Sequence, residues 1–409
     1  HHEQAVSMAA EGYARTSGRP GVGIVTTGPG GTNAITGVAC AWMDSIPQLM
    51  ISGQVYLHQT IGESGVRQMG VQEINIIDLV RPITKYAAMV RCPEEIRIHL
   101  EAAWHQANHG RPGPVWVDIP GDLQQSEIDP QKLEPAPIIP LTNHAPSFDS
   151  SVGQLVSLLT ESQRPLLHIG HGVRLSGACD LLIQFSERYQ IPIATTWNAT
   201  DVIDSSHPLF VGRPGAFAER GANFNVQNAD LVLAIGTRLP FMVTGYQVRD
   251  YARNARRVMV DIDAAELAKT SLDLHLTIQS DAGMLLEALL DCVPADWKPD
   301  EEWLGQCQSL RQKYPIVLDE YRTPASWVSS YYFIKKLSEH LKSDAVVVTD
   351  MGLAFVGTHQ AFQVKRGQVV CTNSGHAPMG WGLPAAIGAC IARGKQPTVC
   401  IAGDGGLMM

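Results

Sequence analysis

Short apolar stretches that alternate with helical stretches constrain the fold of this chain more than any other feature. VGIVTT, QLMISG and PVWVDIP are bounded by Gly or Pro and have the composition of buried strands, whereas the segment from Thr32 to Met43 has helical periodicity. Parallel strands need a crossover connection, which is usually a helix. The alternation therefore predicts a parallel sheet with crossover helices.

The same alternation returns twice later in the chain. A second block contains the strand-like stretches PLLHIG, IPIATT, ADLVLAIG and RRVMVDID, with the helical stretch SGACDLLIQFSERYQ between the first two. A third block contains helix SYYFIKKLSEHL, strand AVVVTD, helix PAAIGACIA and strand TVCIAGD. We therefore predict an α/β chain with three doubly wound parallel-sheet domains.

Two polar breaks separate the blocks. The proline-rich stretch Asp129 to Pro146 has the texture of a linker, and PADWKPDEEW opens a second break within Pro294 to Pro315. The predicted domains are 1–128, 147–293 and 325–409. The chain begins without Met at a helix start and stops at a Gly-Asp-Gly turn, so we expect a piece of a longer protein with incomplete first and last domains.

Composition and charge argue against a membrane-spanning protein and against a protein that binds nucleic acid or a membrane surface. Hydrophobic residues make up 45% and charged residues 17% of the 409 residues, as in ordinary globular proteins, and no apolar run is long enough to span a bilayer. The net charge of -9 provides no basic footprint for nucleic acid or for a membrane surface. The eight cysteines are scattered without a C-x-x-C pair, which favours free thiols in a reducing cytoplasm.

The third block contains two glycine-rich turns, and the second of them in sequence suggests a phosphate site. GDGG at 403–406 follows a strand, so its backbone can approach phosphate at the carboxyl edge of a parallel sheet, and Asp404 can bind a divalent cation. An ordinary turn with a capping Asp is the alternative. In the other turn, NSGHAPMGWGLPAAIGA, glycines surround Met379 just before a predicted helix. By itself this stretch could be only a tight turn with an apolar side chain at its centre.

A third motif opens the chain. HEQAVSMAAEGYAR places small residues at Ala9, Ala10 and Gly12 after Glu3, which predicts a closely packed helix. TTGPGGTN then gives a turn into a helix N-terminus, which suits a ligand or a facing subunit. Taken alone, Glu3 would be an exposed acid in a first helical turn.

Together these motifs resemble the thiamine-diphosphate-dependent enzymes of the acetohydroxyacid (acetolactate) synthase large-subunit type. The matching stretches span the chain and include TTGPGGTNAITGVACAWMDSIPQLMISGQV, ITKYA, RPGPVWVDIPGDLQ, NADLVLAIGTR, VDIDAAEL, GHAPMGWGLPAAIGA and IAGDGG. The resemblance implies a pyrimidine-binding, a central and a diphosphate-binding domain. It also implies a homodimer or homotetramer with active sites at the subunit interface, and it leaves room for a regulatory subunit.

The resemblance assigns roles to particular residues. Glu3 would hydrogen-bond the aminopyrimidine ring of thiamine diphosphate from a dry pocket, so we expect a raised pKa for its carboxyl group. Met379 would bend the cofactor, and Asp404 would bind Mg²⁺ with an Asn that lies beyond Met409. The implied positions for this cofactor are Gly28, Pro29, Gly30, Asn33, Gly375, Met379, Gly403, Asp404 and Gly405.

The central block carries a second implied cofactor. In the family it holds an FAD that has no redox task, and the matching positions are Gly170, Gly172, Gly236, Arg238, Asp261 and Asp263. A GMHG-like turn of the family reads GRPG at 212–215, so an empty site is the alternative. A nucleotide-dependent oxidoreductase would need a full G-x-G-x-x-G, which GHGVRLSG lacks.

The family chemistry implies decarboxylation of a 2-keto acid, with pyruvate as the expected substrate, and carboligation to a carbonyl acceptor. Decarboxylase-like relatives have a His pair where this chain has Val71-Gln72, and an apolar pocket without proton donors favours carbon–carbon bond formation. Gln72 and Lys85 are therefore the expected catalytic or substrate-binding residues beside Glu3. The resemblance places such an enzyme in branched-chain amino acid biosynthesis.

One departure concerns the acceptor. The family's GARFDDRVTG reads GTRLPFMVTG here, so Met242 replaces an Arg that is expected to bind the keto-acid acceptor. Acetyl transfer from pyruvate to a keto-sugar nucleotide is one alternative. A simple 2-keto acid decarboxylase and a non-catalytic relative are the others.

Overall fold

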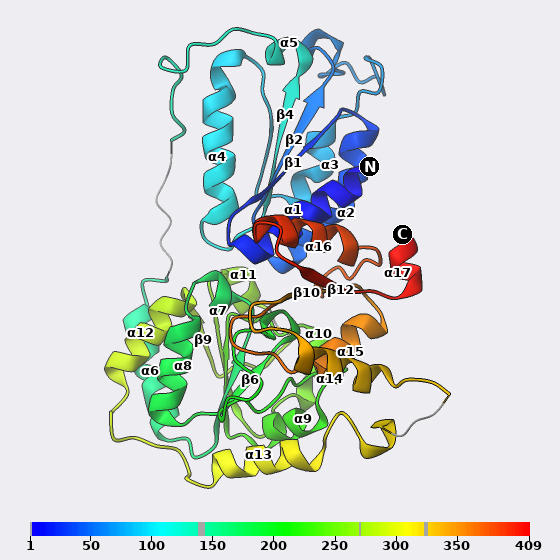
Figure 1. The fold of residues 1–409 in the computed structure, drawn as a ribbon. Helices are drawn as coiled ribbons and strands as arrows, with labels where there is room; N and C mark the ends of the chain where they lie inside the picture. Colours follow the sequence, from blue (N-terminus) through cyan, green and yellow to red (C-terminus); the bar gives the residue numbers. More distant parts are fainter. Residues whose placement is uncertain (1, 138–143, 270, 323–325) are drawn as a thin grey trace. The chain divides into compact units, whose positions relative to one another are not determined.

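The computed structural model describes residues 2–137, 144–269, 271–322 and 326–409 (Figure 1). The predicted linker at 129–146 falls in part on 138–143, outside the described residues. The chain groups into two compact units. Unit 1 comprises 1–141, 346–351 and 371–409, and unit 2 comprises 142–345 and 352–370.

Unit 1 contains a four-stranded parallel sheet of order β1-β2-β4-β3. The elements of this part are α1 (Glu3–Ser17), β1 (Gly21–Val25), α2 (Pro29–Asp44), β2 (Gln48–Gln54), α3 (Ile76–Val80), β3 (Tyr86–Met89), α4 (Ile96–Asn108), β4 (Pro114–Pro120) and α5 (Gly121–Gln124). Met50 and Trp116 pack on α2 and α3, whereas Leu49 and Val115 on the other face pack on α4. Both faces of the sheet are therefore covered, as is usual for parallel sheets.

A three-stranded sheet of order β11-β10-β12 forms from the third block. Its elements are β10 (Val346–Thr349), β11 (Val369–Cys371), α16 (Gly382–Ala392), β12 (Thr398–Ile401) and α17 (Asp404–Met408). Helix α16 packs against α1 within unit 1. A Cβ atom added to Gly12 of α1 would lie 2.2 Å from the carbonyl oxygen of Ala385, so the two helix backbones touch there. The predicted close packing of the first helix is confirmed.

Unit 2 is built on a five-stranded parallel sheet of order β6-β5-β7-β8-β9. Its strands are β5 (Pro165–Ile169), β6 (Ile193–Thr195), β7 (Leu231–Ile235), β8 (Arg256–Asp261) and β9 (Leu276–Gln279). Its helices are α6 (Phe148–Thr160), α7 (Gly172–Leu175), α8 (Cys179–Tyr189), α9 (Arg220–Asn228), α10 (Phe241–Thr244), α11 (Ala264–Leu267), α12 (Ala282–Cys292), α13 (Trp303–Lys313), α14 (Ser330–His340) and α15 (Leu353–Ala361).

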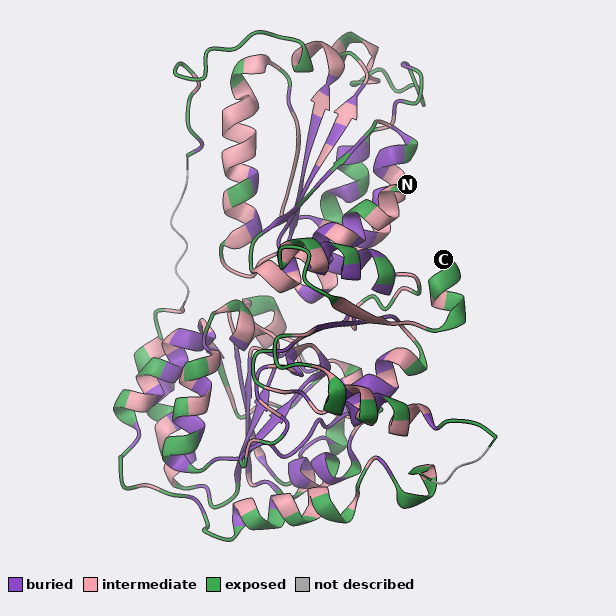
Figure 2. Cartoon of the chain, in the orientation of Figure 1, coloured by how far each residue is buried: buried purple, intermediate pink, exposed green. Residues whose placement is uncertain are grey.

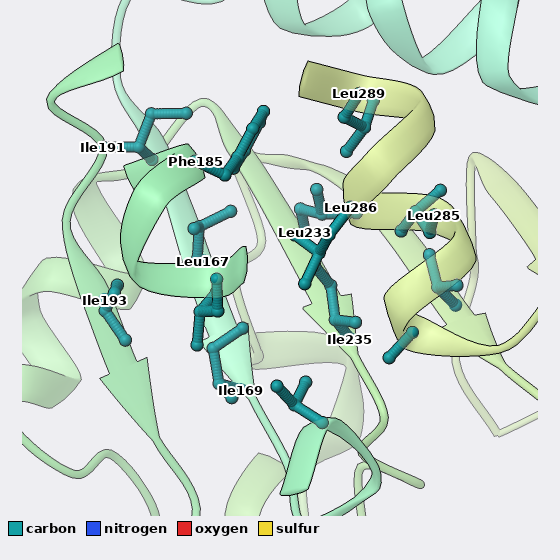
Figure 3. Packing of buried hydrophobic residues seen from close by; sticks show 14 of the residues in the cluster. Leu167, Ile169, Phe185, Ile191, Ile193, Leu233, Ile235, Leu285, Leu286 and Leu289 are labelled. Atoms are coloured by element: carbon teal, nitrogen blue, oxygen red, sulfur yellow. The ribbon is translucent and has the colours of Figure 1, made fainter. Parts of the chain in front are cut away.

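The core of unit 2 lies on both faces of its sheet. Leu167 of β5 and Leu233 of β7 pack against Phe185 of α8 and Leu286 of α12 on one face (Figure 3). On the other face, Val232 packs with residues of α9 and α13. Figure 2 shows the strands as mostly buried and the outer faces of the helices as exposed.

The predicted fold class is confirmed, since all three sheets have only parallel neighbours. Strands occupy all the stretches predicted to be strands, and β3, β9 and β11 lie outside that prediction. Short 3-10 helices complete the described structure at Leu57–Gln59, Arg81–Ile83, Pro93–Glu95, Trp197–Ala199, Val248–Asp250 and Asp319–Arg322. Among the described residues, no helix is both long enough and apolar enough to cross a membrane.

Candidate functional site

A cavity of about 690 Å³ lies beside Glu3 at the carboxyl end of the four-stranded sheet. Its described lining residues are His2, Glu3, Val6, Ile24, Val25, Thr26, Ile51, Ser52, Gly53, Ile119 and Gln124. Glu3 is the first residue of α1, and the Nδ2 of Asn33 donates a 3.1 Å hydrogen bond to its Oε2. A Cβ atom on Gly30 would lie 3.7 Å from Glu3 Oε1. The structure thus brings together Glu3, Gly30 and Asn33.

The hydrogen bonds around Glu3 favour its charged form. The hydrogen bond from Asn33 lowers the pKa of the Glu3 carboxyl, and a backbone hydrogen bond acts in the same direction. Glu3 is only partly buried in this chain, so solvent also reaches its charged form. In this chain these hydrogen bonds therefore lower the pKa of Glu3, and the raised pKa expected with thiamine diphosphate in the pocket stays a prediction. Glu3 is a carboxylate at neutral pH.

A buried acid lies under the same edge of the sheet. Asp118, at the end of β4, accepts hydrogen bonds from Ser52 Oγ at 2.5 Å and from Gln54 Nε2 at 3.0 Å. Burial raises the pKa of Asp118 to about 6. The Oε1 of Gln54 in turn accepts a hydrogen bond from Thr27 Oγ1 at 2.6 Å. Asp118 therefore supports Thr27, which directly precedes the GPGG turn, and sequence reasoning did not single it out.

The GPGG turn contacts the predicted residue Gln72. Gly28 has a φ of 61°, and a Cβ atom there would lie 2.1 Å from the carbonyl oxygen of Gln72, so only glycine fits. Gln72 itself is exposed with a φ of 64°, and Val71 beside it is 85% exposed. The Val71-Gln72 pair is thus at the surface next to the predicted cofactor turn.

Lys85 lies at the opposite edge of this sheet. Its backbone N–H donates to the carbonyl oxygen of Pro114 at the start of β4, and its Nζ donates to the carbonyl oxygen of His109 at 2.6 Å. Burial lowers the pKa of Lys85 to about 8. Since Glu3 lies at the carboxyl edge, the structure does not bring Lys85 and Glu3 together within one chain.

The two glycine-rich turns of the third block meet at Asp350. This buried residue follows β10 and accepts hydrogen bonds from the backbone N–H of Gly380 at 3.1 and 3.0 Å. A Cβ atom on Gly406 would lie 2.6 Å from Asp350 Oδ2. Met379, the predicted wedge, is 51% exposed at this place. Asp350 is a second acid that sequence reasoning missed, although the stretch AVVVTD ends on it.

The predicted metal ligand Asp404 is exposed at the start of α17. Its Oδ1 accepts a 2.9 Å hydrogen bond from the backbone N–H of Gly405. Within the described residues, no three His, Cys, Asp or Glu side chains are grouped so that they could hold a metal ion. Gly403, Asp404 and Gly405 are exposed, and Gly375, in the loop before α16, is partly buried.

Glu3 and Met379 lie toward different ends of the helix pair in one chain. Gly388 of α16 approaches Ala9, whereas Trp381, just before α16, lies at Arg15, near the end of α1 away from Glu3. Helix α1 has 15 residues, which is about 22 Å at 1.5 Å per residue. Among the described residues that line the cavity beside Glu3, none belongs to 375–379 or 403–405.

Three of the positions implied for FAD, Gly170, Gly172 and Gly236, lie close together. A Cβ atom on Gly170 would lie 2.2 Å from the carbonyl oxygen of Gly236, and one on Gly172 would lie 2.7 Å from the Cα of Gly236. These glycines are therefore required for contact between the loops after β5 and β7, with or without a ligand. The carbonyl oxygen of Arg238 accepts a hydrogen bond from Lys269, outside this loop contact.

The two acids after β8 act within their own loop. Asp261 Oδ1 accepts a hydrogen bond from the backbone N–H of Asp263 at 3.0 Å, and the side chain of Asp263 caps α11. In the GRPG turn, Arg213 is buried and forms a 3.2 Å ion pair with Glu219. These side chains are thus engaged with the protein itself.

Comparison with known proteins identifies three domain families along the chain. Residues 1–79 match the family described as thiamine pyrophosphate enzyme, N-terminal TPP binding domain. Residues 152–289 match the central domain and residues 350–409 the C-terminal TPP binding domain of the same enzymes.

Individual relatives match over the whole chain. The acetolactate synthase isozyme 2 large subunit of Escherichia coli (strain K12) is 36% identical over 408 residues, covering 100% of this chain and 71% of the relative. A probable acetolactate synthase large subunit of Methanocaldococcus jannaschii is 35% identical, covering 100% and 69%. The acetolactate synthase large subunit of Lactococcus lactis is 34% identical with the same coverage. The chain therefore belongs to the thiamine-diphosphate-dependent enzymes, in the group of the acetolactate synthase large subunits.

Proposed function

We propose that this protein decarboxylates a 2-keto acid, pyruvate, and joins the remaining two-carbon unit to a carbonyl acceptor, as an acetolactate synthase does. The match of the whole chain to acetolactate synthase large subunits carries this proposal. Thiamine diphosphate, when bound, supplies the carbanion chemistry. The protein supplies binding, orientation, exclusion of water and control of protons.

The cavity beside Glu3 suits the pyrimidine end of the cofactor. Its volume of about 690 Å³ is within the range of small-molecule sites. Ile24, Ile51 and Ile119 give it apolar walls, and Glu3 is a carboxylate held in place by Asn33. We propose that Glu3 shares a proton with a ring nitrogen of the cofactor, and that burial by the cofactor and by a second subunit then raises its pKa.

The GDGG turn and the loop around Met379 suit the other end of the cofactor. Gly403 and Gly405 offer backbone N–H groups without side chains, which a diphosphate can approach. We propose that Asp404 binds Mg²⁺ there and that Met379, together with Gly375, shapes the bent conformation of the cofactor. Both turns meet at Asp350, which supports treating them as one site.

A second copy of the chain completes this site in our proposal. Glu3 and Met379 lie toward different ends of the α1–α16 pair, so one chain does not bring both to the same cofactor. A homodimer or homotetramer in which neighbouring copies supply the two halves removes this separation. Gln72 lies beside the Gly28 turn of the chain that carries Glu3, whereas Lys85 would act across such an interface. The relatives are named large subunits, which supports a regulatory subunit as a further partner.

FAD remains a proposal for the central unit. Gly170, Gly172 and Gly236 converge just after strands β5 and β7, at the edge where such sheets bind nucleotides. The FAD would be structural, with no electron transfer. Flavin absorbance of the purified protein distinguishes a bound FAD from an empty site.

The alternatives to this reaction are not favoured. A simple decarboxylase needs a proton donor at the reacting carbon, and Val71-Gln72 provides an apolar side chain and an amide instead. A non-catalytic relative would have no reason to keep Glu3, Met379 and Asp404 together. We place the enzyme in branched-chain amino acid biosynthesis in the cytoplasm, and its eight free cysteines support a reducing compartment.

The test supplies the full-length protein with pyruvate, Mg²⁺ and thiamine diphosphate. We expect carbon dioxide release with acetolactate as the product and without net acetaldehyde, and we expect the Glu3→Gln variant to fold but to lose most of this activity. Stoichiometric acetaldehyde would contradict carboligation. Keto-sugar nucleotides in parallel reactions test the alternative acceptor, because an acetylated sugar nucleotide would be identified by its mass.

A further inference from the structure

A buried carboxylate connects helix α1 to the loop that carries Met379. Glu11, which is 0% exposed, accepts hydrogen bonds at Oε1 from Arg15 Nε and Nη2 at 2.9 and 2.7 Å. The same oxygen accepts from Asn373 Nδ2 at 2.9 Å, and Oε2 accepts from Trp381 Nε1 at 2.7 Å. Arg15 also pairs with Asp44 at 2.6 Å, so the guanidinium group lies between two acids. Glu11 thus contacts both ends of the segment 373–381.

The first end of this segment depends on Asn373. While its Nδ2 donates to Glu11, its Oδ1 accepts hydrogen bonds from the backbone N–H groups of His376 and Ala377 at 3.2 and 3.1 Å. Ala377 has a φ of 56°, a left-handed conformation that costs free energy for a residue with a Cβ atom. Such a conformation persists only where surrounding contacts fix it. Asn373 provides these contacts, and Glu11 fixes Asn373.

The second end is held by two acids. The backbone N–H of Gly380 donates to Asp350, and the indole of the fully buried Trp381 donates to Glu11. Met379 therefore projects from a short loop whose two ends are fixed, although its own side chain is 51% exposed. Wedge-like action requires this arrangement, because an exposed side chain can impose a shape on a ligand only if its backbone does not move.

We propose that Glu11 is a positioning residue that fixes the backbone on both sides of Met379, and through it the geometry of the bound cofactor. This inference rests on the proposed function of Met379. A carboxylate is suited to the role because it accepts at both oxygens and has no donor. A glutamine in its place would present an N–H₂ group to at least one of the donors, and that hydrogen bond would be lost.

A purely structural role for Glu11 makes a different prediction. If the carboxylate only stabilises the fold, its replacement lowers global stability and raises amide hydrogen exchange broadly. If it positions the Met379 loop, the change is local to 373–381 and reaches the chemistry of the cofactor. Glu101 provides a matched control, because it also pairs with an Arg one helical turn away, Arg97, but on the partly exposed helix α4.

The experiment compares wild type, Glu11→Gln, Trp381→Phe and Glu101→Gln in the full-length protein. Without cofactor, we expect the amide hydrogen exchange rate in 374–381 to rise about tenfold in Glu11→Gln. The rate should rise less in Trp381→Phe, because in that variant Glu11 keeps its hydrogen bonds with Arg15 and Asn373. In both variants, peptides of the four-stranded sheet should exchange at the wild-type rate. The control Glu101→Gln should exchange at the wild-type rate throughout. Broad acceleration, or no acceleration in either variant, would overturn the proposal. Should Glu11→Gln not fold, Trp381→Phe decides the question.

A second measurement uses thiamine diphosphate and Mg²⁺. We expect hydrogen–deuterium exchange at C2 of the bound cofactor to slow at least about tenfold in Glu11→Gln, while the affinity for the cofactor changes less than about threefold. An equal loss of affinity and exchange rate would indicate a structural role. If wild type itself failed to bind thiamine diphosphate, the proposed function would fall, whereas the amide exchange result would still decide whether Glu11 fixes the loop.

Discussion

The side chain of Asp118 is buried, and hydrogen-bond donors of neighbouring residues favour its charged form. Its side chain accepts from Ser52 and Gln54, yet burial raises its pKa from 3.8 to about 6. Between these values the folded state binds the proton more tightly than the unfolded state does. The contribution of Asp118 to stability therefore falls as the pH rises from about 4 to about 6, by on the order of 3 kcal/mol.

The direction of this pH dependence of stability can be checked with Asp118→Asn, because an asparagine side chain does not titrate. We expect the free energy of unfolding of wild type, relative to the variant, to fall by roughly 3 kcal/mol between about pH 4 and pH 7. Urea denaturation at several pH values measures it. Asp129→Asn, at an exposed residue, is the control and should follow wild type. Parallel curves for wild type and Asp118→Asn would show that the pKa of Asp118 is not raised.

Sequence motifs predicted some of the site residues and missed others for a physical reason. Glu3 and Asn33 were expected at the cofactor site, and they are in contact at one cavity. Glu11 and Asp118 lie inside the motif stretches but receive no role from them, and Asp350 lies outside them, because each acts by accepting hydrogen bonds from residues distant in the sequence. The motifs also do not show that the hydrogen bond from Asn33 lowers the pKa of Glu3 in the chain itself, since that contact joins residues 30 positions apart.

At the scale of elements, strands followed from composition where Val, Ile and Leu dominate the stretch. LVLAI and VVVT are dominated by β-branched and leucine residues, and both form strands. Of the strands that were missed, YAAM and LTIQ contain fewer Val, Ile and Leu residues than those two, and VVC has only three residues. Their pairing depends on a neighbouring strand that is already in place, which a local pattern does not reveal.

Helix α1 depends on glycine at its crossing with α16. A Cβ atom on Gly12 would lie 2.2 Å from the Ala385 carbonyl oxygen, and the neighbouring atom is backbone, so the helices would have to separate. We expect Gly12→Ala to lower the free energy of unfolding by about 2–3 kcal/mol.

Gly153 in the exposed part of α6 supplies the matched control, because a Cβ atom there meets nothing within 4 Å. The same substitution at Gly153 should raise stability by about 0.5–1 kcal/mol through higher helix propensity. Urea denaturation of both variants without cofactor measures the difference. Equal effects at the two positions would mean that the backbones of α1 and α16 are not in contact.

At the scale of the whole molecule, a single chain separates the residues that the proposed chemistry must unite. Glu3 opens α1, while Trp381, two residues after Met379, contacts Arg15 near the other end of that helix. The cavity beside Glu3 has no lining residue from the Met379 loop among the described residues. Motifs predicted which residues are needed, but their sequence order does not say which copy provides each one. An assembly in which copies exchange halves of the site accounts for both observations.

Complementation between two inactive variants tests this assembly. Glu3→Gln and Asp404→Asn, each with its own affinity tag, are expected to be inactive alone. Mixed dimers purified through both tags would contain one site with Glu3 and Asp404 intact and one site with both substituted, so about half of the wild-type activity should return. Two differently tagged copies of Glu3→Gln are the control and should stay inactive. If each site were formed within one chain, every site in the mixed dimer would carry one substitution, and no activity would return.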